Sequence, residues 1–107
     1  MNGRCIIKLK KDDQEWYLEW SSTIDAPITF AMSKEEMTIW LRKQRWFDFE
    51  IENLMKQLDK TGCGLPNVKS VEDLIRDNRA GENKECLTYE QIVEKFCLKQ
   101  DATLMEG

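Results

Sequence analysis

Histidine is missing from this sequence of 107 residues. Its absence removes the commonest general acid–base group near neutral pH and leaves a serine or cysteine nucleophile without its usual activator. Zinc sites of the Cys2His2 and Cys3His types are excluded for the same reason. The 20 acidic residues include no pair that stands out as a catalytic dyad. The sequence therefore predicts a binding protein rather than an enzyme, without a metal or a cofactor.

Long apolar runs are also missing. No run approaches the roughly 20 residues that a membrane span needs. The first stretch, MNGRCIIKLKKDD, lacks the apolar region and cleavage site of a signal peptide. We therefore expect a cytoplasmic chain without a membrane partner. The length favours one domain, residues 1–107, built around a single core.

Four cysteines are present, but no two of them form a CxxC pair. With no secretory segment to suggest disulfides, we expect four reduced thiols. Cys5 follows an alternating apolar pattern and Cys97 follows a phenylalanine, so both are expected to be small buried hydrophobes. Cys63 stands between Gly62 and Gly64 and is expected to be exposed and reactive.

Three short stretches alternate between apolar and polar residues, which is typical of half-buried strands. Their apolar positions are Cys5, Ile7 and Leu9, then Trp16, Leu18 and Trp20, then Ile28, Phe30 and Met32. They predict a three-stranded antiparallel β-meander within residues 4–32. Pro27 at the start of the third stretch indicates a strand beginning or an edge position. Trp16 and Trp20 are interpreted as core residues rather than as ligand contacts.

The rest of the chain has the periodicity of short helices. Capping boxes at Ser33 with Glu36 and at Thr88 with Gln91 mark two helix starts. We expect helices over about 33–44, 48–59 and 70–78 and a fourth from 88, and a frayed tail from 100. The fold class is therefore α+β, with about four short helices packed on one face of the sheet.

The stretch RDNRAGENK, residues 76–84, is the strongest candidate for a ligand site. Arg76 and Arg79 flank Asn78, and Gly81 with Asn83 can adopt left-handed conformations that turn backbone N–H groups toward an anion. The alternative is an ordinary helix end, capped by Gly81, with arginines near the negative pole of the helix. We favour that alternative from the residues alone, because the spacing of a phosphate loop is absent.

Charge and surface patterning limit the partners. The net charge of −4 has the wrong sign for a general nucleic-acid coat, so that function is the weakest alternative. It would rely on the basic residues beside Trp46, which are Arg42, Lys43 and Arg45. Tyr17 points away from the tryptophans, and two open sheet edges remain. We therefore expect a homo-oligomer, formed either through an interface at Tyr17 or by pairing of sheet edges.

Three stretches, GRCIIKL, LEWSSTIDAPIT and DNRAGENKECLTYEQIV, together resemble small uncharacterised proteins of tailed bacteriophages. The resemblance implies an accessory protein that acts in the host cytoplasm. One function it implies is a counter-defence sponge that sequesters a nucleotide signal, with Arg76, Arg79, Trp46 and Tyr17 supplying cationic and aromatic contacts. The other is an inhibitor that docks on a host protein through an apolar patch with a polar rim.

Overall fold

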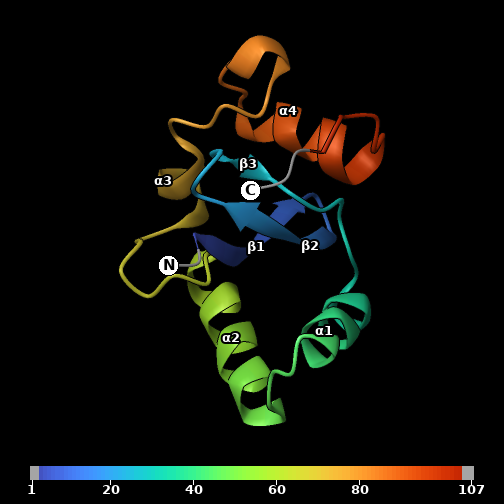
Figure 1. Ribbon diagram of the computed structural model, residues 1–107, viewed down its shortest axis with the longest axis vertical. Helices are drawn as coiled ribbons and strands as arrows, with labels where there is room; N and C mark the ends of the chain where they lie inside the picture. Colours follow the sequence, from blue (N-terminus) through green and yellow to red (C-terminus); the bar gives the residue numbers. More distant parts are fainter. Residues whose placement is uncertain (1–2, 105–107) are drawn as a thin grey trace.

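A three-stranded antiparallel sheet lies at the centre of the computed structural model, which describes residues 3–104 (Figure 1). Its strands follow the order β1 (Arg4–Lys11), β2 (Gln14–Ser21) and β3 (Ala26–Pro27). The turn between β1 and β2 is tight, and Asp12 in it has a φ of 56°, a conformation that aspartate accepts better than most residues. The predicted α+β class and the predicted antiparallel sheet are both confirmed.

Four α-helices follow within the described residues, and both predicted capping boxes form. The Ser33 side chain accepts from the backbone N–H of Glu36 at 3.1 Å, and the Thr88 side chain accepts from that of Gln91 at 3.1 Å. No helix within residues 3–104 has both the length and the apolar character needed to cross a membrane. The helical elements are α1 (Lys34–Lys43), α2 (Asp48–Thr61), α3 (Val71–Ile75), a 3-10 turn η1 (Glu82–Lys84), α4 (Tyr89–Val93) and its π-helical continuation η2 (Glu94–Leu98).

The register of β1 against β2 sorts the side chains onto two faces. Cys5 lies opposite Trp20, Ile7 opposite Leu18 and Leu9 opposite Trp16. This face packs against α3, α4 and η2 in what we call the upper core. Cys5, Trp16 and Phe30 border that core, and Leu18 and Trp20 are buried in it, as the alternation predicted. The core residues contributed by the helices are Val71, Ile75, Ile92, Val93, Phe96 and Cys97.

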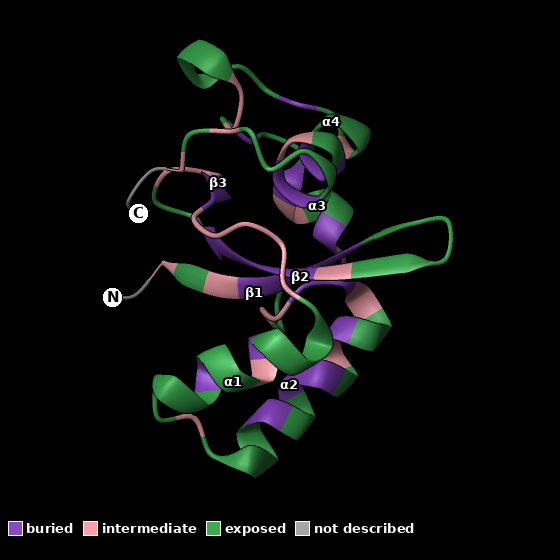
Figure 2. Ribbon diagram, turned by 90° about the vertical axis from the view of Figure 1, so that its right-hand side faces the viewer, coloured by how far each residue is buried: buried purple, intermediate pink, exposed green. Residues whose placement is uncertain are grey.

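The other face of the sheet is covered as well, so the prediction that all helices pack on one face was wrong. Ile6 and Tyr17 lie on this second face, and α1 and α2 cover them in what we call the lower core (Figure 2). Tyr17 is only 3% exposed and forms no open interface. The apolar residues that made this face look unpartnered are buried by the chain itself. The helical residues of the lower core are Met37, Leu41, Ile51, Leu54, Met55 and Leu58.

The third strand is shorter than predicted. β3 contains only Ala26 and Pro27 and lies at the edge of the sheet, which is one of the two alternatives that Pro27 indicated. The chain then bulges away from β2 and returns at Met32, whose backbone pairs with that of Tyr17 at 2.8 and 2.9 Å. Because of this bulge Phe30 packs against the upper core and Met32 against the lower core, although strict alternation places both on one face.

The outer edge of β1 is covered by the segment that follows α2. The N–H of Lys8 donates to the carbonyl of Gly62 at 2.8 Å, and the N–H of Gly64 donates to that of Ile6 at 2.9 Å. Cys63, between them, is fully buried, so the prediction of an exposed Cys63 was wrong. With the β1 edge paired and Tyr17 buried, one of the two sheet edges and the Tyr17 face no longer support the predicted homo-oligomer.

Lys8 is a buried cation on the lower face of the sheet. Its side chain is 5% exposed, and its ammonium contacts Asp59 of α2 at 2.6 Å and Glu15 of β2 at 3.0 Å. Burial by itself lowers the pKa of Lys8, but its hydrogen bonds to the two carboxylates raise that pKa by more, to above the ordinary lysine value. The hydrogen bond from Lys8 also lowers the pKa of Asp59. The contact joins the end of α2 to the sheet.

This ion pair predicts a loss of stability in acid. The pKa of Asp59 is lower in the folded state than in the unfolded state. The stability that the ion pair contributes is therefore fully present above the unfolded pKa, about 3.9, and is lost as the pH falls through the folded pKa. Below about pH 4, Asp59→Asn should therefore differ less and less from the wild type in its free energy of unfolding. Urea titrations at pH 7, 4 and 3 measure the difference.

The control for this prediction uses the partner. In a Lys8→Met background, adding Asp59→Asn should produce no such pH-dependent difference, because the lysine that perturbs the carboxyl group is gone. An equal difference at every pH in the wild-type background would contradict the assignment.

Candidate functional site

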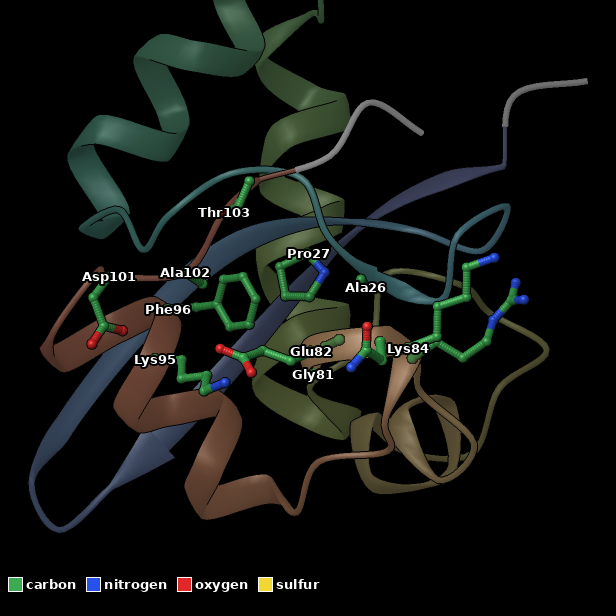
Figure 3. Close-up of a pocket in the computed structure, with 13 residues that line it drawn as sticks. Ala26, Pro27, Gly81, Glu82, Lys84, Lys95, Phe96, Asp101, Ala102 and Thr103 are labelled. Carbon is green, nitrogen blue, oxygen red and sulfur yellow. The ribbon is translucent and has the colours of Figure 1, made fainter.

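A cavity of about 500 Å³ lies where four segments of the chain meet (Figure 3). Its walls are β3, residues 79–84, η2 and residues 101–103. Three of the residues predicted as a ligand site, Arg79, Gly81 and Asn83, line it. The volume is within the range of small-molecule sites, about 300–1,000 Å³.

Asn78, another predicted site residue, holds the loop rather than facing the cavity. It is 2% exposed. Its amide nitrogen donates to the carbonyls of Ile75 and Leu87 at 2.7 Å each, and its amide oxygen accepts from the N–H groups of Ala80 at 3.2 Å and Leu87 at 2.9 Å. One side chain therefore ties the end of α3 to the segment that leads into α4, and positions the residues between them.

The turn at residues 81–85 has the left-handed conformation predicted at Asn83 but not the one predicted at Gly81. Asn83 and Lys84 are left-handed, with φ of 54° and 64°, whereas Gly81 has a φ of −85°. α3 ends at Ile75, so Gly81 does not cap it either. Gly81 is required for close approach, because an added Cβ would lie 2.8 Å from the Leu87 side chain and 2.9 Å from the Glu85 carbonyl oxygen.

The cavity has a mixed charge. Three cationic side chains line it, those of Arg79, Lys84 and Lys95, against the carboxylates of Glu82 and Asp101. The loop before β3 holds the Arg79 side chain. Its guanidinium lies 3.3 Å from a carboxylate oxygen of Asp25 and donates to the carbonyl of Thr23 at 3.3 Å. The Arg79 side chain is still 45% exposed. An anion in the cavity would therefore meet a fixed cation and two lysines.

The aromatic contacts expected for a nucleotide base are not assembled here. Phe96 lines the cavity but is only 2% exposed, so it offers no free ring face for stacking. Trp46 packs at the margin of the lower core, and Tyr17 lies inside that core, on the opposite side of the sheet. Arg76 is outside the cavity and pairs with Asp73 at 2.6 Å on the surface. The predicted set of residues therefore does not converge on one point.

Sequence reasoning missed the second half of the cavity. Residues 101–103 form one wall, and Ala102 and Leu104 pack against the upper core, so the tail is not frayed over the described residues up to 104. The apolar residues within the tail were the available signal. Lys95 and Asp101 were missed because only the folded chain brings them into the same cavity as Arg79.

A different surface feature lies at the turn between α1 and α2. Phe47 and Phe49 are 66% and 63% exposed, and their rings stack with centroids 5.8 Å apart and planes 8° from parallel. Arg42 and Asp48 form an ion pair of 3.1 Å next to them. We call the two phenylalanines the aromatic tip. Contiguous exposed apolar surface is typical of interaction sites, so the aromatic tip is a candidate surface.

Comparisons of the chain with models of protein families, with curated proteins and with solved structures give no match. Within residues 3–104, no group of three or more acidic or cysteine side chains is arranged to hold a metal ion. Hypotheses about function therefore rest on the Arg79 cavity, the aromatic tip and the resemblance of the quoted stretches.

The hydrogen bonds of Asn78 predict a large effect of its removal. Asn78→Ala removes four hydrogen bonds to backbone groups, and of these groups the Ile75 carbonyl still accepts from the backbone N–H of residue 78. The substitution should lower the free energy of unfolding by at least about 2 kcal/mol, mainly through the two Leu87 groups that lose a buried partner. Asn67→Ala, at an exposed loop position, should change it by no more than about 0.5 kcal/mol. Urea unfolding at pH 7 compares the two. A small effect of Asn78→Ala would show that the loop is held by other contacts.

Proposed function

We propose that this chain is a phage-type accessory protein that acts in the host cytoplasm by sequestering a small anionic ligand, of which a nucleotide signal of host defence is the leading class. Binding, rather than turnover, is its activity. The observation that carries the proposal is the Arg79 cavity, which Arg79, paired with Asp25, lines together with Lys84 and Lys95. The phage-type origin is supported by the resemblance of the quoted stretches alone.

The charges of the cavity narrow the ligand. A phosphate is recognised well by a fixed guanidinium together with ammonium groups. Glu82 and Asp101 would repel a ligand that is anionic throughout, but their carboxylates accept hydrogen bonds from hydroxyl or amino groups. A molecule with a phosphate at one end and sugar hydroxyls or an amine at the other satisfies both sets of side chains. Inorganic phosphate alone would satisfy only the cations.

The test is a thermal-shift and native mass-spectrometry screen against cyclic dinucleotides, cyclic trinucleotides, ADP-ribose derivatives and inorganic phosphate. A ligand that binds only the native state adds about 2.7 kcal/mol to its stability at a hundredfold excess over Kd. For a ligand that binds, Arg79→Ala should cost about 1.5 to 3 kcal/mol of binding free energy, which is the range for a charged hydrogen bond.

Arg76 provides the matched control, because Arg76→Ala removes the same charge from a neighbouring turn without touching the cavity. It should leave the affinity nearly unchanged. Equal weakening by both variants would indicate a general effect of net charge, and a bound ligand insensitive to Arg79→Ala would place the site elsewhere. Absence of binding by every compound would count against the sequestration proposal.

The aromatic tip favours a second candidate function, in which the chain docks on a host protein. Phe47 occupies the N-cap position of α2, where serine, threonine, aspartate or asparagine stabilises a helix best. The position therefore lacks a side-chain cap and instead carries an exposed ring that stacks on Phe49. The neighbouring Lys43 and Arg45 are exposed, which suits a partner surface with an apolar pocket and an acidic rim.

The substitution Phe47→Ser tests whether Phe47 serves docking or the stability of the fold, because the two roles predict opposite changes in stability. Serine at this N-cap should raise the free energy of unfolding by about 1 kcal/mol, while docking is lost. Leu98→Ser, which removes another exposed apolar side chain far along the chain, should leave docking unchanged. Pull-down from bacterial lysate, followed by titration with the purified partner, measures docking.

Two other outcomes are informative. A lower stability of Phe47→Ser would show that the tip is part of the fold. Self-association of the wild type in light scattering, abolished by Phe47→Ser, would identify a second copy of the chain as the occupant of the tip and establish the homo-oligomer through this surface.

A further inference from the structure

Two cysteines from distant parts of the chain lie side by side at the edge of β1. Cys63 is paired opposite Ile7 by the hydrogen bonds on either side of it, from Lys8 to Gly62 and from Gly64 to Ile6. In an antiparallel pairing, residues opposite each other share a face, and so do residues two positions apart in one strand. Cys5 therefore lies on the same face as Cys63 and diagonally adjacent to it.

Their shared face allows a hydrogen bond between the two thiols, which perturbs the pKa of each. This bond, followed by burial, raises the pKa of Cys5. The same bond lowers the pKa of Cys63, because the thiolate form of Cys63 is the better acceptor. The two cysteines therefore differ in their roles. Cys63 is the one that more readily forms a thiolate, and Cys5 is the thiol that donates a hydrogen bond to it. Both are free thiols in this structure.

The surroundings give the pair one route to solvent. Cys63 is fully buried, whereas Cys5 is partly exposed near the start of β1.

The backbone of the segment after α2 lies very close to β1 at this point, since a Cβ on Gly64 would lie 2.9 Å from the carbonyl oxygen of Ile6. Gly64 therefore allows the segment to approach β1 closely enough to bring the two side chains together.

We propose that Cys5 and Cys63 form an oxidisable dithiol that closes to a disulfide when the protein meets hydrogen peroxide. The site is distinct from the Arg79 cavity and from the aromatic tip, and it does not rest on either proposed function. Closing the bond would link β1 covalently to the segment after α2 and enclose β2, β3, α1 and α2 in the loop. The disulfide would stabilise this part of the fold, which includes the lower core, against unfolding.

The reaction needs only the peroxide as oxidant. The Cys63 thiolate attacks one peroxide oxygen, the O–O bond breaks, and the leaving hydroxide takes a proton to become water. The resulting sulfenic acid is attacked at sulfur by Cys5, the S–O bond breaks, and the departing oxygen leaves as a second water with the proton from Cys5. In sum, two thiols and one hydrogen peroxide give one disulfide and two waters, with two electrons passing from the sulfurs to the peroxide.

The experiment treats the reduced full-length protein with hydrogen peroxide, blocks remaining thiols with N-ethylmaleimide, and maps peptides by mass spectrometry without reduction. The expected result is a Cys5–Cys63 cross-linked peptide, with the free thiols falling from four to two. The melting temperature should rise by about 10 °C, because the bond closes a long loop, and dithiothreitol should reverse the change.

Cys86→Ser is the matched control, since Cys86 is exposed and its loss should leave the cross-link intact. Cys5→Ser should abolish the cross-link and the rise in melting temperature. The peptide map of the wild-type protein tests the proposal even if the Cys5→Ser variant fails to fold. Oxidation confined to Cys86 or Cys97, or to dimers between chains, with Cys5 and Cys63 still reactive after denaturation, would overturn the proposal.

Discussion

β1 and β2 pair along their full lengths, and the register of that pairing determines where every other element can pack. With Ile7 opposite Leu18, the upper face carries the tryptophans, and the lower face carries Ile6, Tyr17 and Lys8. A shift by one residue would exchange the two faces and move a lysine into the upper core. Both layers of helices, the bulge after β3 and the wall of the cavity depend on this one alignment (Figure 2).

Lys8 shows how a charge can position a helix. A lysine enclosed by a sheet and a helix is unfavourable unless its ammonium is paired, and the two carboxylates around it keep contact with solvent. An apolar residue at position 8 would pack on α2 in several ways, whereas an ammonium 2.6 Å from Asp59 favours one. The chain leaves α2 two residues later, and the same geometry carries Cys63 to the edge of β1. The ion pair and the dithiol are therefore consequences of one docking arrangement.

The features that the sequence predicted correctly are those set by near neighbours. The alternation of β1 and β2 and the capping residues Ser33 and Thr88 act within a few positions of each other, so the local pattern was sufficient. Most of the errors concern distant contacts. Nothing near Tyr17 shows that α1 will cover it, and nothing near Cys63 shows that it will pair with β1. Likewise, Arg79 was recognisable as a candidate cation, but Lys95 and Asp101 join it only through the packing of η2 and the tail.

The two candidate surfaces lie at opposite ends of the long axis, with the segment around η1 at one end and the turn between α1 and α2 at the other (Figure 1). Each depends on a different core, since Phe96 of the cavity belongs to the upper core and the helices behind the aromatic tip build the lower one. Substitutions at two such distant surfaces are expected to act additively. Coupling between them would have to pass through the β1–β2 pair, the element that both cores share. A change in ligand affinity caused by occupying the aromatic tip would therefore indicate a shift in the sheet itself, and independence would mean that one rigid sheet supports two separate binding surfaces.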